Sequence, residues 1–70
     1  MSQFSDSLKT MRKQSDKKQR EVAAYLGINI RTYQNYEGGQ SEPSISQLIK
    51  LADLFMVSLD ELVGRDWIGL

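Results

Sequence analysis

Hydrophobic residues recur along the chain at the three- and four-residue spacing that is typical of amphipathic helices. Phe4, Leu8 and Met11 form the first such stripe, which predicts a helix over about residues 3–14. Polar and charged residues at 15–17 then interrupt the pattern. We therefore expect the first helix to end before this break.

A second stripe follows the break. Val22, Ala23 and Leu26 predict a helix over about residues 18–26. Gly27 comes directly after the stripe, and glycine adopts the left-handed conformation that closes many helices. The second helix is therefore expected to end at this glycine.

Capping signals mark three further helices. Asn29, Ser44 and Ser58 have side-chain oxygens that accept hydrogen bonds from the N–H groups of a first helical turn. The predicted helices are residues 29–37, 44–55 and 58–63. No stretch alternates as a strand does, so the pattern predicts an all-α fold. We expect a five-helix domain over residues 1–64 and a tail over 65–70, which packs on the core or forms a dimer contact.

Composition narrows the function classes. The chain has 70 residues, no cysteine and no histidine, so disulfides, thiolate metal sites and imidazole acid–base chemistry are excluded. No apolar run approaches the ~20 residues that span a bilayer. The expected protein is soluble and cytoplasmic, has no membrane partner, no metal, no cofactor and no evident small-molecule ligand, and is not an enzyme.

The formal net charge of zero conceals an uneven distribution. Residues 9–31 include seven basic and two acidic side chains, whereas residues 32–70 include two basic and six acidic ones. A polyanionic partner responds to the local field of one face and not to the total charge. The basic half is therefore a candidate nucleic-acid surface, or else an ordinary solvated one.

The segment around Gly27 has the features of a helix-turn-helix. Ala23 lies four residues before the glycine and permits close helix packing, and Ile28 follows it as an apolar plug. Two helices joined in this way cross at a wide angle. The helix after the turn is therefore expected to project its N-terminal half outward.

That outward half is rich in side chains that suit base edges. Asn29, Gln34 and Asn35 can make the bidentate contacts that read adenine, and Arg31 matches the two acceptors of guanine. Ile30 falls on the same polar face. It either meets a thymine methyl group or packs against a neighbouring loop.

The sequence resembles the phage-repressor-type (Cro/cI, Xre) helix-turn-helix regulators over about Phe4 to Val63. The matching blocks are Met11-Arg12, Gln19-x-x-Val-Ala-x-x-Leu-Gly-Ile28, Tyr36-Glu37-x-Gly39, Pro43-Ser44, Leu48-x-x-Leu51-Ala52 and Val57-Ser-Leu-Asp-Glu-Leu62. A glycine turn alone would be weak support, but these blocks keep one register over about sixty residues. The resemblance implies a compact lambda-repressor-like domain whose helix 29–37 enters the major groove.

The resemblance also implies separate roles for the site residues. Those expected to face bases are Asn29, Ile30, Arg31, Gln34 and Asn35. Those expected at phosphates are Lys17, Lys18, Gln19, Thr32, Tyr36, Gly38 and Gly39, with packing as the alternative for Tyr36 and solvated surface as the alternative for the two lysines. Arg12 and Glu37 match a structural salt bridge that fixes the reading angle.

Several positions depart from the family pattern. Lys18 replaces the usual serine or threonine cap, which weakens that cap unless Asp16 substitutes. Met56 stands where glycine or asparagine usually ends a helix, so a left-handed conformation there would be strained. Tyr33 replaces a branched apolar residue and is expected in the core with its hydroxyl in water. Glu42 would repel a phosphate.

Taken together, the residues and the resemblance predict a sequence-specific regulator of transcription. It is expected to be a repressor of phage or mobile-element type that binds double-stranded DNA as a homodimer on an inverted repeat. The alternative is a protein-interaction module with the same fold, such as an antitoxin or an adaptor.

Overall fold

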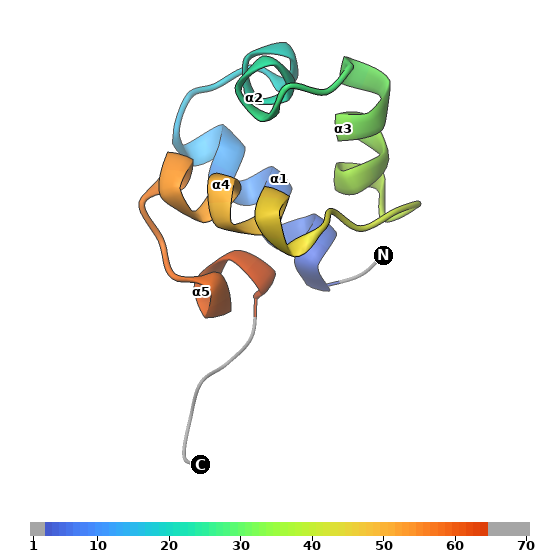
Figure 1. Ribbon diagram of the computed structural model, residues 1–70. Coiled ribbons are helices and arrows are strands. Elements are labelled where there is room, and N and C mark those ends of the chain that lie inside the picture. Colours follow the sequence, from blue (N-terminus) through green and yellow to red (C-terminus); the bar gives the residue numbers. More distant parts are fainter. Residues whose placement is uncertain (1–2, 65–70) are drawn as a thin grey trace, which may run out of the picture.

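The computed structural model describes residues 3–64, and most of them lie in five helices (Figure 1). The helices are α1 (Gln3–Gln14), α2 (Gln19–Leu26), α3 (Ile30–Gly38), α4 (Ile45–Phe55) and α5 (Leu59–Val63). No strand occurs within residues 3–64, so the all-α prediction is confirmed. The predicted tail, residues 65–70, lies outside the described residues.

The predicted caps account for where three helices begin. The side-chain oxygens of Asn29, Ser44 and Ser58 each accept the backbone N–H three residues later, at 2.8, 3.3 and 3.1 Å respectively. Because a cap residue is itself not helical, these helices begin one residue later than predicted.

The start of α2 differs from the other three. The residue at the cap position is Lys18, and its side chain makes no capping bond. Instead Glu21 accepts the backbone N–H of Lys18 at 2.8 Å. The expected weak cap is therefore present, and a carboxylate from the first turn partly compensates for it.

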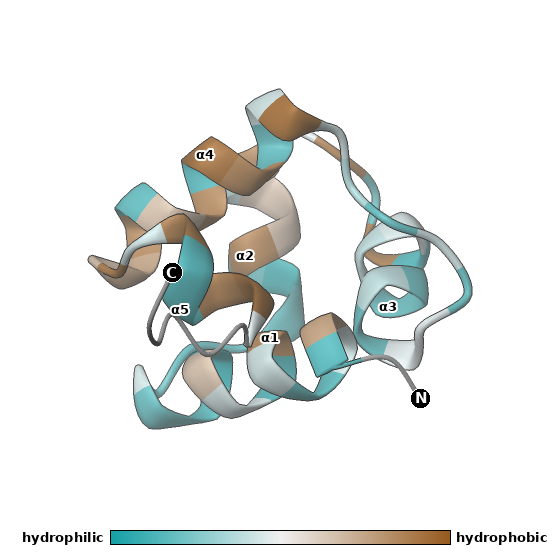
Figure 2. Ribbon diagram, turned by 90° about the horizontal axis from the view of Figure 1, so that it is seen from below, coloured by the Kyte–Doolittle hydropathy of each residue, from teal (hydrophilic) through white to brown (hydrophobic). Residues whose placement is uncertain are grey.

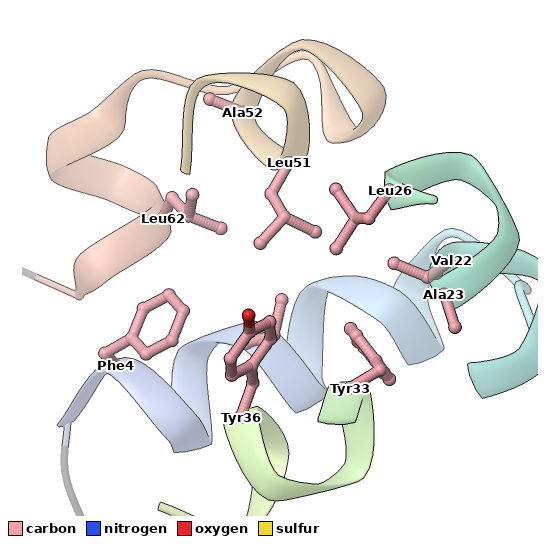
Figure 3. Close-up of a cluster of buried hydrophobic side chains, with 10 residues drawn as sticks. Phe4, Val22, Ala23, Leu26, Tyr33, Tyr36, Leu51, Ala52 and Leu62 are labelled. Atoms are coloured by element: carbon pink, nitrogen blue, oxygen red, sulfur yellow. The ribbon is translucent and has the colours of Figure 1, made fainter. Parts of the chain in front are cut away.

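One hydrophobic cluster holds the helices together (Figure 3). Every helix contributes to it, and its buried members are Phe4, Leu8, Val22, Ala23, Leu26, Tyr33, Tyr36, Leu51, Ala52 and Leu62. The two stripes predicted from helical spacing supply half of this list. In Figures 1 and 2, α3 stands at one side of the molecule, where α2 and α1 cover only its inner face. The outer face of α3 is consequently open to a ligand.

No helix among residues 3–64 is long and apolar enough to cross a membrane.

Met56 closes α4 in the left-handed region, with φ of 57°. A β-carbon makes this conformation costly, by roughly 1–2 kcal/mol. The side chain is 90% exposed and contributes little packing. We expect Met56→Gly to raise the free energy of unfolding by about 0.5–1 kcal/mol, the relieved strain less the extra backbone entropy of glycine.

Thermal unfolding measures this effect, because about 1 kcal/mol shifts the Tm of a domain of this size by roughly 4–8 °C. Met56→Ala is the matched control, since it removes the same side chain but keeps the β-carbon. Equal Tm values for the glycine and alanine variants would show that the backbone at this position is not strained.

Candidate nucleic-acid interface

The turn between α2 and α3 has the predicted geometry. Gly27 adopts φ of 73° and ψ of 28°, and its N–H donates to the carbonyl of Ala24 at 3.1 Å. The N–H of Ile28 donates to the carbonyl of Ala23 at the same distance, and the Ile28 side chain packs against the core. A β-carbon at Gly27 would meet nothing within 4 Å. Glycine is therefore needed here for its backbone conformation and not for space.

The residues predicted to read bases share the outer face of α3. Ile30, Arg31 and Gln34 are exposed, Asn35 is partly so, and Asn29 is exposed at the helix start. Tyr33, Tyr36 and Glu37 occupy the opposite, buried face. The isoleucine keeps 43% of its surface exposed, which leaves its branched end accessible to an apolar group. The structure thus brings all five residues to one accessible surface.

Asn29 also works as the cap of α3. Its side-chain oxygen accepts the N–H of Thr32 at 2.8 Å, which uses one of the two lone pairs of that oxygen. The cap fixes the side chain at the start of α3. The NH2 group and the second lone pair are the parts of Asn29 that remain for a base contact.

Two glutamines link α2 to the outer face of α3. The NH2 group of Gln34 donates to the side-chain oxygen of Gln19 at 3.1 Å, and the NH2 group of Gln19 donates to Glu37 at 3.0 Å. Gln19, predicted at a phosphate, is therefore bonded directly to Gln34, predicted at a base. This arrangement holds the exposed amide of Gln34 in one orientation.

A polar cluster lies beneath this surface, centred on the Glu37 carboxylate. Glu37 is only 2% exposed and accepts from Arg12 Nε at 2.5 Å, Arg12 Nη2 at 3.3 Å and the Tyr33 hydroxyl at 2.5 Å, in addition to Gln19. The structure therefore contains the salt bridge between Arg12 and Glu37. Arg12 also donates to the carbonyl of Lys17 at 2.9 Å. The cluster thus joins α1, the turn before α2, α2 itself and α3.

The surroundings of Glu37 shift the pKa values of the cluster. Burial alone would raise the pKa of Glu37, but hydrogen bonds from Arg12, Tyr33 and Gln19 and the charge of Arg12 outweigh it, so this pKa is lowered. Burial, and then the bond to Glu37, raises the pKa of Tyr33. The hydrogen bond to Glu37 raises the pKa of Arg12. Glu37 and Arg12 are therefore charged, and Tyr33 is neutral, at physiological pH.

The cluster corrects the expectation for Tyr33. Its ring packs in the core as predicted, but the residue is fully buried and its hydroxyl bonds to Glu37 and not to water. Tyr33 and Gln19 share the carboxylate with Arg12, which was not predicted from the sequence. The four-residue spacing between Tyr33 and Glu37, which places two side chains on one helix face, was the available signal.

The residues predicted at phosphates lie at the edges of α3 and at the start of α2. Lys17 and Lys18 precede α2, whose N–H groups and positive dipole end favour an anion. Gly38 and Gly39 close α3, the latter with φ of 80°. Thr32 is partly exposed on α3. Tyr36 differs, because it is 8% exposed and its ring points from α3 into the core (Figure 3), which favours packing over phosphate contact.

Comparison with known proteins gives a consistent result. Residues 8–62 match the family described as Helix-turn-helix. The chain is 38% identical over 60 residues to the cryptic phage CTXphi transcriptional repressor RstR of Vibrio cholerae serotype O1, covering 86% of this chain and 54% of that protein. It is 43% identical over 61 residues to the HTH-type transcriptional regulator AnsR of Bacillus subtilis, covering 87% and 53%. The chain thus spans about half the length of these two relatives.

Solved structures agree. A transcriptional regulator from Listeria innocua superposes with a TM-score of 0.86 at 34% identity, over 96% of this chain and 63% of that one. The SOS-response transcriptional repressor LexA from Eubacterium rectale superposes with a TM-score of 0.82 at 25% identity, over 96% and 71%. The arrangement of helices around the turn is therefore shared with solved regulators.

Proposed function

Because the chain belongs to the phage-repressor-type (Xre, Cro/cI) helix-turn-helix family, we propose that it binds specific double-stranded DNA sequences as a regulator of transcription, with α3 in the major groove. One observation carries this proposal. Ile30, Arg31 and Gln34 on α3 are exposed, Asn35 is partly exposed and Asn29 is exposed at the helix start, whereas the buried residues of α3 are Tyr33, Tyr36 and Glu37. The relatives named as a phage repressor and a regulator support a repressor of phage or mobile-element type.

The positions of these residues support separate roles in phosphate contact and in base contact. Lys17, Lys18 and the N-terminal end of α2 favour phosphate on one side of α3, and Gly38 and Gly39 offer backbone on the other. Phosphate contacts of this kind set the position of a protein on the duplex but carry little sequence information. Sequence preference then comes from the outer face of α3, from Asn29 to Asn35.

A homodimer on an inverted repeat is the second part of the proposal. One short recognition helix reads only a few base pairs, so two copies with half-sites about 34 Å apart, or one helical turn, give the usual specificity of helix-turn-helix proteins. A regulator that binds DNA must share a compartment with that DNA, which is consistent with the expected cytoplasmic location.

Selection of bound sequences from a random duplex pool tests the proposal. We expect the recovered sites to share an inverted repeat, and binding to weaken by about 10³–10⁵ between about 50 and 200 mM salt if the dimer makes about six to ten phosphate contacts. The salt dependence follows from the release of counterions by Lys17, Lys18 and the neighbouring basic residues. The measurement is the slope of log K against log salt concentration.

Two results together would contradict DNA binding. They are a selection that enriches no sequence and an affinity that does not change with salt concentration. They would leave the same fold acting as a protein-interaction module. Enrichment of single half-sites without a fixed repeat would support DNA binding but contradict the proposed homodimer.

A further inference from the structure

An apolar cleft of about 200 Å³ opens on the surface at the junction of α1, α4, α5 and the loop that connects α3 to α4. Its lining residues are Phe4, Glu42, Pro43, Leu48 and Val63. None of them belongs to the surface proposed to bind DNA. A cleft of this kind leaves apolar side chains in contact with water, and the helices leave it uncovered within residues 3–64.

The described part of the chain ends beside this cleft. Val63, the last residue of α5, lines it, and Gly64 follows in a left-handed conformation with φ of 75°. The carbonyl of Gly64 accepts a hydrogen bond from the Gln3 side chain, and Ser7 donates to the carbonyl of Glu61 at 3.0 Å. These bonds attach the end of α5 to the start of α1. The end of the described chain is therefore held at the cleft.

The residues that follow are Arg65, Asp66, Trp67, Ile68, Gly69 and Leu70. We propose that Trp67 of the same chain occupies the cleft and completes the hydrophobic core there. Trp67 is four residues beyond Val63, so the backbone can reach about 13–14 Å from that residue, enough to turn back over the cleft. A closed apolar cavity of about 150 Å³ holds a benzene molecule. A cleft of about 200 Å³ that is open on one side accommodates the larger indole ring.

Charge at the rim favours the same occupant. Among the lining residues that lie within 3–64, Glu42 contributes the only acidic group, and Arg65 precedes the tryptophan by two positions in the sequence. In an extended segment, residues two apart point to the same side, whereas the residue between them points away. Arg65 can then approach Glu42 while Trp67 enters the cleft and Asp66 faces water.

Docking of the tail would have a structural consequence beyond covering the cleft. It would place the indole against Pro43, in the loop that directly follows α3, and against Phe4 and Val63 from the two helices that begin and end the domain. The tail would thereby link the two ends of the domain to that loop. This proposal does not depend on DNA binding.

Tryptophan fluorescence of the 70-residue chain tests the proposal, because Trp67 is the only tryptophan. We expect its emission to be shifted to shorter wavelength than in the urea-unfolded chain, and its acrylamide quenching constant to be several-fold lower, at every protein concentration. Val63→Ser and Glu42→Arg, which alter the floor and the rim of the cleft, should each raise the quenching constant. Ile49→Ser, at an exposed apolar position outside the cleft, is the matched control and should leave it unchanged.

Three results would overturn the assignment. The first is a quenching constant in the native chain equal to that in urea. The second is protection that appears only as the protein concentration rises, which would assign the indole to a contact with a second copy. The third is protection that neither Val63→Ser nor Glu42→Arg reduces, which would place the ring elsewhere on the domain. Circular dichroism confirms that each variant is folded, and Glu42→Arg, at an exposed position, keeps the test decisive if Val63→Ser unfolds.

Discussion

Replacing Glu37 with alanine should lower the free energy of unfolding by about 3–5 kcal/mol, the usual cost of removing one partner from a buried ion pair. The carboxylate is 2% exposed and accepts bonds from Arg12, Tyr33 and Gln19. Its loss leaves these donors in or near the core without their acceptor. A domain of this size has a total stability of only about 3.5–10 kcal/mol, so the variant should be close to unfolding at 25 °C.

Urea denaturation followed by circular dichroism measures the loss. Asp53→Ala is the matched control, because it removes an exposed carboxylate from the same half of the chain and should change stability by no more than about 0.5 kcal/mol. The double variant Arg12→Ala with Glu37→Ala should be less destabilised than the sum of the two single variants, since the partners are removed together. Additive losses would mean that the two side chains do not interact in solution.

The pH dependence of stability provides a second measurement at the same site. The pKa of Glu37 is lower in the folded protein than its ordinary value of 4.5. Its ionised form therefore stabilises the fold above about pH 4.5, and this contribution disappears as the pH falls through the folded pKa. We expect the stability difference between the wild type and Glu37→Gln to narrow over this acidic range. A difference that stays constant down to pH 2 would contradict the lowered pKa.

The same cluster shows how far the sequence could predict this structure. The helices followed from apolar spacing and from caps such as Asn29 and Ser58, because both depend on residues close in sequence. The salt bridge between Arg12 and Glu37 came only from the family resemblance. Gln19 joins this carboxylate from another helix, and nothing in local spacing shows that two segments eighteen residues apart converge on it.

The candidate site could also be predicted only as far as it depends on residues close in sequence. The outer face of α3 follows from helical periodicity, and Ile30, Arg31 and Gln34 are exposed as expected. The bond between Gln34 and Gln19 and the full burial of the Tyr33 hydroxyl depend on how α2 and α3 cross. The cleft beside Val63 depends on the packing of four segments distant in sequence. Long-range packing is the part that local patterns do not encode.

The Glu37 cluster also connects stability to recognition. Gln19 donates to the buried carboxylate and accepts from Gln34, so one chain of hydrogen bonds runs from Arg12 in the interior to the exposed face of α3. Fixing exposed side chains in advance reduces the entropy lost on binding. Variants of Arg12 or Tyr33 that remain folded should therefore bind DNA more weakly, although neither residue is proposed to touch DNA.

Replacing Arg31 with alanine should have the largest effect on sequence preference. Arg31 is exposed in the first turn of α3 and is the only basic residue of that helix. An arginine that contacts guanine through both acceptors contributes about 1–3 kcal/mol, so we expect a loss of roughly 5- to 150-fold in affinity for the selected site and a relaxed preference at one base pair. Competition binding against duplexes that carry each of the four base pairs at that position measures both effects.

Lys18→Ala is the matched control, because it removes one exposed positive charge at the start of α2 without removing a side-chain cap. It should weaken binding to all sequences about equally and reduce the salt slope by about one. The two variants therefore separate the proposed roles: Arg31→Ala changes which sequence is preferred, and Lys18→Ala changes how strongly any duplex is held. If Arg31→Ala instead lost affinity equally for the selected site and for random DNA, Arg31 would belong with the phosphate contacts, and the reading of bases would rest on Asn29, Gln34 and Asn35.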